Sequence, residues 1–114
     1  MRYVVCQKDD VAPGEMRSVM LGGQIRVVLI RDRRGNYRAL RDACSHQGAL
    51  LSAGRLEAMV TDGYEPAVEQ DVVRCPWHGF EFDVESGRCP ADPNKARVKS
   101  YAVEVDGDDV VIVR

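Results

Sequence analysis

The chain has 114 residues, of which 45% are hydrophobic and 30% charged, with a formal net charge of −2. This size fits one compact domain, and 16 basic against 18 acidic residues lack the basic excess of nucleic-acid-binding surfaces. No apolar run reaches the roughly 18 residues of a membrane-spanning helix. Charges follow Met1 too soon for a secretory signal, so we expect no membrane association and a reducing, cytoplasmic location.

Short runs of β-branched and aromatic residues alternate with turn signals along the chain. The runs are 3–6, 26–31, 37–40, 98–105 and 110–113, and the turn signals are Pro13-Gly14, Gly22-Gly23, Arg34-Gly35-Asn36 and Asp106-Gly107-Asp108. No long segment keeps a helical period without interruption. We therefore predict an all-β protein with little helix, built as a small antiparallel sandwich or barrel.

Both histidines of the chain lie close to a cysteine. His46 follows Cys44 by two residues, and His78 follows Cys75 by three. Thiolate and imidazole are ligands of zinc and of iron–sulfur centres, and the short spacing lets each pair bind from one loop. Two alternatives follow. The four residues surround one structural Zn²⁺, or two thiolates hold one iron and two imidazoles the other iron of a [2Fe-2S] cluster.

The residues around the two pairs favour the cluster. The loops read Cys44-Ser45-His46-Gln47-Gly48-Ala49-Leu50-Leu51 and Cys75-Pro76-Trp77-His78-Gly79-Phe80-Glu81-Phe82-Asp83, the second continuing to Ser86-Gly87. They resemble the cluster loops of Rieske-type ferredoxins, C-x-H-x-G-A-x-L and C-P-W-H-G-x-x-F-D-x-x-[ST]-G. The resemblance implies one [2Fe-2S] cluster per chain with Cys44, His46, Cys75 and His78 as ligands. A structural zinc-binding module is the remote alternative.

The resemblance also implies how the chain is organised. Residues 1–114 form a single Rieske domain, an antiparallel β sandwich of the iron–sulfur-protein type. Framework strands come from residues 1–41 and 93–114, and a two-loop cluster-binding subdomain from about 42–92. The segment beginning Cys89-Pro90 resembles the proline-containing loop that closes over the cluster. Cys6 and Cys89 are left over, and we expect them to be free, partly buried thiols.

The segment between the two cluster loops is longer than usual. His46 and Cys75 are separated by 28 residues, more than in typical family members, which places an insertion at about 57–73. This insertion is either a surface hairpin, since extra loop length costs little closure entropy, or a docking surface or cluster shield. Its acidic residues are Asp62, Glu65, Glu69 and Asp71.

Four positions predict a low redox potential. In the high-potential Rieske proteins of respiratory complexes, the family pattern has two disulfide-forming cysteines, a serine and a tyrosine where this chain has Ala49, Trp77, Phe80 and Phe82. Without the hydroxyl donors, negative charge on a reduced cluster is less well stabilised. We therefore predict a low-potential, oxygenase-type centre.

The remaining motifs indicate an electron carrier that is not an enzyme by itself. The sequence has no glycine-rich phosphate loop, and both histidines are already used, so a separate mononuclear iron site lacks ligands. The resemblance implies a flavin-dependent reductase upstream and the oxygenase of an aromatic-ring-hydroxylating system downstream. We expect a monomer that meets both transiently. The alternative is a small Rieske subunit of another redox enzyme, such as nitrite reductase.

Overall fold

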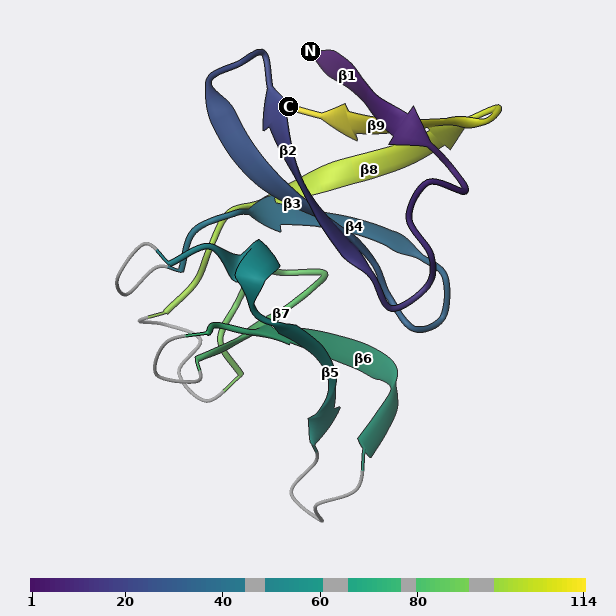
Figure 1. Cartoon of the computed structure of the whole chain (residues 1–114). Helices are drawn as coiled ribbons and strands as arrows, with labels where there is room; N and C mark the ends of the chain where they lie inside the picture. The colour runs from purple at the N-terminus through teal and green to yellow at the C-terminus, as the bar shows by residue number, and fades with distance from the viewer. Residues whose placement is uncertain (45–48, 61–65, 77–79, 91–95) are drawn as a thin grey trace.

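The computed structural model describes residues 1–44, 49–60, 66–76, 80–90 and 96–114 (Figure 1). In these ranges the chain is almost entirely β. Its elements are β1 (Arg2–Gln7), β2 (Met16–Leu21), β3 (Ile25–Arg31), β4 (Tyr37–Arg41), the 3-10 turn η1 (Leu51–Ala53), β5 (Arg55–Val60), β6 (Pro66–Arg74), β7 (Glu81–Asp83), β8 (Ser100–Asp106) and β9 (Asp109–Val113). None of the described helical segments is long and apolar enough to cross a membrane. The all-β prediction is confirmed.

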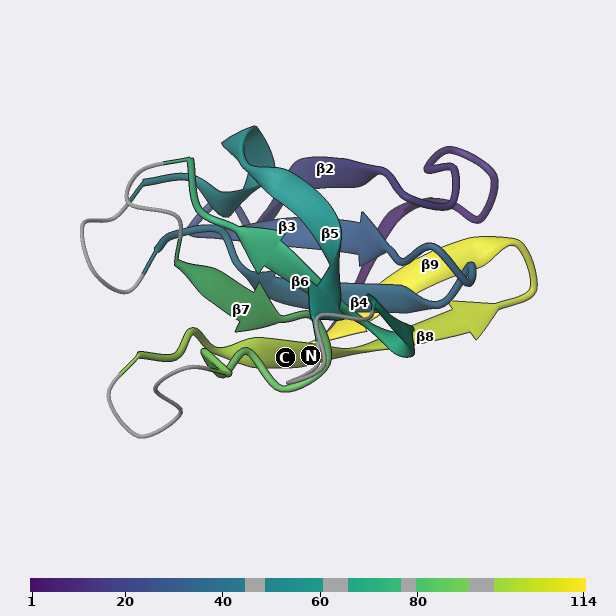
Figure 2. The same ribbon diagram turned by 90° about the horizontal axis from the view of Figure 1, so that it is seen from below.

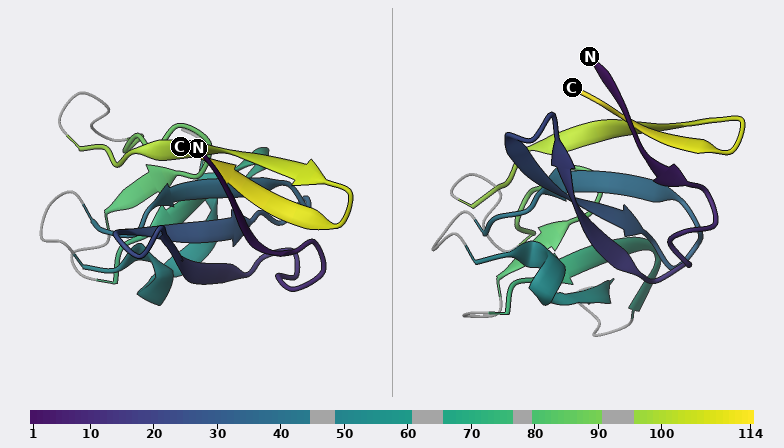
Figure 3. Two further views of the ribbon diagram at one scale, coloured as in Figure 1. Left: turned by 90° about the horizontal axis from the view of Figure 1, so that it is seen from above. Right: turned by 45° about the horizontal axis from the view of Figure 1, so that its top comes forward.

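The strands form two antiparallel sheets. The larger sheet has six strands in the order β1-β9-β8-β4-β3-β2, and the smaller has three in the order β5-β6-β7. Figures 1 and 2 show the smaller sheet lying against one side of the larger one. The termini lie together on the far side of the larger sheet (Figure 3), where β1 pairs with β9. The larger sheet thus comes from the two ends of the sequence and the smaller one from its middle.

Strand β3 is buried on both faces, because each face supports a different core. Val28 and Ile30 belong to the core that also contains Val73 and Phe82 of the smaller sheet. Val27 and Leu29 belong to a second core within the larger sheet, which also contains Val110 and Ile112 of β9. The continuous run Val27-Val28-Leu29-Ile30 is explained by this position, since a strand covered on both sides loses the usual polar alternation.

The predicted strand at 98–105 begins two residues too early. Strand β8 starts at Ser100, because the residues before it pair with a different segment. The Val98 amide donates a hydrogen bond to the Gly87 carbonyl oxygen at 2.8 Å, and Arg97 forms an isolated antiparallel bridge with Arg88. Strands β2, β5, β6 and β7 were not predicted as separate runs, since their apolar residues are interrupted by charged or small ones.

The segment predicted as an insertion contributes directly to the core. It spans most of the β5–β6 hairpin, and Val72 and Val73 are buried. Asp71 is only 5% exposed, and the guanidinium of Arg33 contacts its carboxylate with two nitrogens at 2.6 Å. The Arg33 amide also donates to this carboxylate at 2.9 Å. Asp71 therefore joins the smaller sheet to the β3–β4 turn. Asp62 and Glu65 lie outside the described residues.

Arg33→Ala is expected to lower the free energy of unfolding by about 2–3 kcal/mol, because it leaves the buried carboxylate of Asp71 without its charged partner. The measurement is urea unfolding of Arg33→Ala, Asp71→Ala and the double variant, which gives the coupling energy. We expect a coupling above about 1 kcal/mol.

The matched control is the surface pair Arg2–Glu104, whose side chains are 52% and 51% exposed. Its coupling should stay below about 1 kcal/mol, because water already solvates both groups. Equal couplings for the two pairs would contradict a special role for the Arg33–Asp71 contact.

Candidate metal centre

Two of the four predicted ligands lie in the described part of the chain, and both are buried. Cys44 comes shortly after β4 and is 4% exposed, and Cys75 comes directly after β6 and is 2% exposed. Both belong to the core between the two sheets. Residues 31 positions apart in the sequence are thus brought into one group of buried side chains. His46 and His78 lie outside the described residues.

Each of these cysteines closes its own loop in the same way. The Cys44 amide donates a hydrogen bond to the Ala49 carbonyl oxygen at 2.6 Å, and the Cys75 amide donates to the Phe80 carbonyl oxygen at 2.7 Å. The donor and the acceptor are five residues apart in both cases. Each predicted histidine therefore falls inside a short span whose two ends are tied together.

A buried carboxylate fixes the chain that leads to Cys44. Asp42 is 2% exposed, and its carboxylate accepts hydrogen bonds from the amide and the hydroxyl of Ser52, at 2.8 and 2.7 Å. The Asp42 amide donates to the Arg26 carbonyl oxygen at 3.0 Å. Asp42 is therefore a positioning residue that joins β3, the first loop and η1. Sequence reasoning missed it, because its partner Ser52 is ten residues away.

The segments that flank the two loops approach each other through their backbones. Gly54 ends the turn η1, where its amide donates to the Leu51 carbonyl oxygen at 2.9 Å. A Cβ atom on Gly54 would lie 1.9 Å from the carbonyl oxygen of Arg74, the residue before Cys75. Only glycine allows this approach. The segment after the first loop thus packs against the segment that leads into the second.

The comparison with known families decides what this site is. The family model for the Rieske [2Fe-2S] domain matches residues 1–102. The chain belongs to the Rieske [2Fe-2S] domain family. Among relatives, the ferredoxin component of biphenyl 2,3-dioxygenase from Rhodococcus jostii (strain RHA1) is 32% identical over 108 residues, covering 95% of this chain and 88% of that protein.

Solved Rieske structures agree with the fold. A complex of reduced oxygenase and oxidized ferredoxin in carbazole 1,9a-dioxygenase contains a chain that is 27% identical, with a TM-score of 0.77 and coverage of 98% of this chain and 92% of that one. A putative NADH-dependent nitrite reductase small subunit from Mycobacterium tuberculosis has a TM-score of 0.84 at 22% identity, covering 100% and 95%. The second similarity establishes the shared fold only.

Membership in the Rieske family identifies the cofactor as a single [2Fe-2S] cluster. The described residues fit such a group, because two buried thiols approach from separate loops and all four cysteines, which the structure describes, are without disulfides. Cys6 lies apart, packed against the second core, and burial raises the pKa of its thiol. A raised pKa disfavours the thiolate that metals require.

The residues predicted to lower the potential of the Rieske centre surround these cysteines. Phe82 is fully buried, Ala49 is 7% exposed, and both lie in the same core as Cys44 and Cys75. Phe80 packs partly buried against this group. None of the three side chains carries a hydroxyl that could donate to cluster sulfur. Trp77 lies outside the described residues.

A third segment contributes to the core that contains the cysteines of the Rieske centre. Residues 87–89 and 96–98 form a narrow antiparallel ribbon, in which the Cys89 amide donates to the Ala96 carbonyl oxygen at 3.0 Å. Cys89, Ala96 and Val98 are buried in the core that holds Cys44 and Cys75. Of the predicted closing loop, residues 91–93 lie outside the described residues. The described parts of all three loop segments emerge at the end opposite the β8–β9 hairpin (Figure 2).

Proposed function

We propose that this chain is the ferredoxin component of an aromatic-ring-hydroxylating oxygenase system. The relative from Rhodococcus, of which it covers 88%, is such a component, and a structural neighbour was solved in complex with its oxygenase. When bound, the cluster supplies a centre that takes up and releases one electron at a time. The observation that carries the proposal is the pair of buried thiols, Cys44 and Cys75, in a Rieske domain.

The proposed ligands are Cys44 and Cys75 on one iron and His46 and His78 on the other, following the Rieske pattern. The chain's own contribution is to hold the two loops and to exclude water around the thiols. The hydrogen bonds at the base of each loop, the Asp42–Ser52 contact and the Gly54–Arg74 approach all serve this purpose. Such preorganisation keeps the ligands in place in both redox states.

We propose a flavin-dependent reductase as the electron donor, and a monomer that exchanges between donor and acceptor. Electron-transfer encounters have small interfaces and are short-lived, which suits a carrier that must bind two partners in turn. A fixed small subunit of a nitrite reductase is the competing assignment, supported by a shared fold. Stable co-purification with a large enzyme subunit would favour that assignment.

The test is an EPR spectrum of the anaerobically purified, reduced protein, together with iron and sulfide counts and a redox titration. We expect two irons, two sulfides and a rhombic signal whose mean g lies below that of all-cysteine clusters. The midpoint potential should lie below about +100 mV, because Ala49, Phe80 and Phe82, the described side chains at the positions that set the potential, carry no hydroxyl donor. One zinc without sulfide, or a signal typical of an all-cysteine cluster, would contradict the proposal.

A further inference from the structure

The outer face of the ribbon formed by residues 87–89 and 96–98 is basic. Along residues 87–89 and 96–99 the side chains alternate between the two faces. Gly87, Cys89, Ala96 and Val98 are buried, whereas three cations are exposed. These cations are Arg88, Arg97 and Lys99, and we call them the ribbon patch. The inner face of the ribbon thus belongs to the core that contains Cys44 and Cys75, and the patch lies on its outer face.

The arrangement of the two arginines is costly for the fold. Arg88 and Arg97 are directly opposite in an antiparallel bridge. The flanking hydrogen bonds, Cys89 to Ala96 and Val98 to Gly87, make this the non-hydrogen-bonded type of pair, in which side chains lie closest. Like charges in such a pair destabilise a sheet. Among the described residues, no carboxylate forms an ion pair with Arg88, Arg97 or Lys99.

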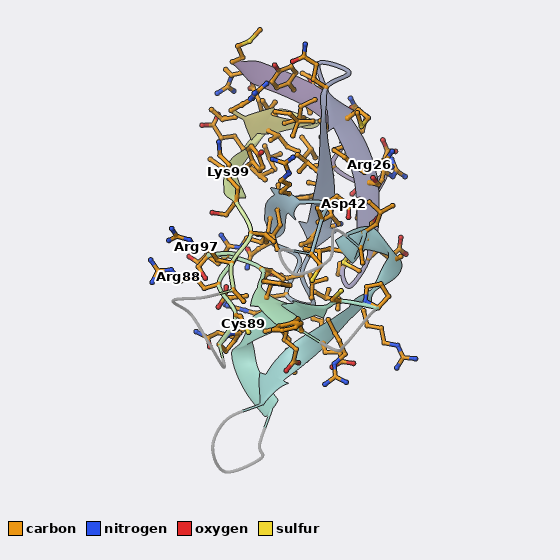
Figure 4. All side chains as sticks on the ribbon, turned by 90° about the vertical axis from the view of Figure 1, so that its left-hand side faces the viewer. Arg26, Asp42, Arg88, Cys89, Arg97 and Lys99 are labelled. Carbon is orange, nitrogen blue, oxygen red and sulfur yellow. The ribbon has the colours of Figure 1, made fainter. Side chains whose placement is uncertain are left out.

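The patch surrounds a shallow hollow rather than a flat surface. A cavity of about 440 Å³ is lined by Ser86, Arg88, Arg97, Val98, Lys99 and Ser100. Figure 4 shows Arg88 and Arg97 side by side at one edge of the molecule, with Lys99 on the same edge. The Lys99 ammonium lies 5.1 Å from the centroid of the Tyr101 ring. This cation–π contact favours one position of the Lys99 side chain. The cations therefore stand around a common space with exposed hydroxyls.

Two further exposed charges lie near the patch, the cation Arg41 and the carboxylate of Glu85, so cations outnumber carboxylates there. The Arg41 amide donates a hydrogen bond to the Lys99 carbonyl oxygen at 2.8 Å, which places Arg41 beside the patch, and its side chain is exposed. The nearby carboxylate of Asp42 is 2% exposed and accepts two hydrogen bonds from Ser52. This face of a chain with a net charge of −2 is thus locally positive.

We propose that the ribbon patch docks the acidic face of a protein electron-transfer partner. This inference rests on the proposed function, since it concerns how a carrier meets its partner. Charge complementarity steers transient encounters and raises association rates, and the patch lies next to the cluster loops, where a short transfer distance is needed. The partner is a protein rather than a small anion, because the cations are exposed at the rim of a shallow hollow and not buried in an enclosed pocket.

The test compares the holoprotein with a patch variant and with a control variant of equal charge. The patch variant carries Arg88→Gln, Arg97→Gln and Lys99→Gln. The control carries Lys8→Gln, Arg34→Gln and Arg114→Gln, directly after β1, in the β3–β4 turn and at the C-terminus. Both variants lose three positive charges, so a difference between them reports the location of the charges. The midpoint potentials of both variants are measured first, so that a difference in electron-transfer rate can be separated from a difference in driving force.

Two probes are used in stopped-flow experiments. Reduced flavodoxin, an acidic protein, donates one electron to the oxidised cluster. Ferricyanide, a small anion, takes one electron from the reduced cluster and becomes ferrocyanide. At an ionic strength of about 10 mM, electrostatic screening is weak. There the rate constant for reduction by flavodoxin should be at least about tenfold lower for the patch variant than for the control variant. This difference should largely disappear at about 300 mM salt.

Equal flavodoxin rates for the patch and control variants would overturn the proposal. An effect seen with ferricyanide alone would also overturn it, because the hollow would then be a small-anion site. Failure of the proposed function looks different, since the reduced protein would then lack the rhombic, low-mean-g EPR signal of a Rieske cluster. A normal cluster with patch-independent rates rejects the docking surface alone.

Discussion

Cys44→Ser and Cys75→Ser proteins are each expected to purify without a [2Fe-2S] cluster. A serine hydroxyl does not ionise near neutral pH, so the substituted loop offers iron no anionic sulfur ligand. Both positions are nearly fully buried, at 4% and 2% exposure, and water cannot readily replace the missing ligand there. The measurement is the iron and sulfide content per chain with the visible absorption spectrum, which should both fall to background.

The chain supplies two matched controls for this experiment. Cys89→Ser changes a cysteine that is 3% exposed in the same buried group, and Cys6→Ser changes one that packs against the other core. Both variants should keep two irons. Loss of the cluster in Cys89→Ser, with folding intact, would place Cys89 in the ligand set and contradict the assignment made from the two cysteine–histidine pairs.

Gly54→Ala is expected to destabilise the protein by about 3 kcal/mol or more. The added methyl group would lie 1.9 Å from the Arg74 carbonyl oxygen, so two backbone segments must separate. Since Arg74 precedes Cys75, the same displacement misplaces the second cluster loop. We therefore expect a lower cluster content as well as a lower melting temperature, by roughly 10 °C for a domain of this size.

Gly23→Ala separates a steric clash from an ordinary glycine effect. Gly23 has a φ of +71°, and a Cβ there would meet nothing within 4 Å. Its cost should be only about 1–2 kcal/mol, from the left-handed backbone, with a full complement of iron. Gly54 has a φ of −87°, so its backbone carries no such strain. Equal losses in the two variants would show that the Gly54–Arg74 approach has no special importance.

The framework could be predicted from sequence because its signals are local. Runs of β-branched residues separated by glycine turns predicted β1, β3, β4 and β9 closely. The predicted start of β8 was wrong, because the Val98 amide forms a hydrogen bond with the Gly87 carbonyl oxygen instead of joining the strand. No local sequence pattern indicates this contact. The strands of the smaller sheet were missed as separate elements, since β5 and β6 contain few consecutive β-branched residues.

The residues of the candidate site also fall into two groups, those that a local sequence motif identified and those whose roles depend on distant partners. Cys44 and Cys75 were identified because each has a histidine at ligand spacing and a loop of the family pattern. Three other residues were not identified, because each acts through a partner that only folding brings near. These pairs are Asp42 with Ser52, Gly54 with Arg74, and Asp71 with Arg33. As sequence, Asp71 was one of several acidic residues in a segment that looked like a surface hairpin.

The burial of β3 on both faces has a consequence for how the molecule comes apart. Val27 and Leu29 face one core while Val28 and Ile30 face the other, so neither core can open without exposing apolar surface of the shared strand to water. The electron-carrying end is therefore not an appendage that frays on its own. The two cores therefore unfold as one cooperative unit. A weakened contact in either core lowers the free energy of unfolding of the whole chain.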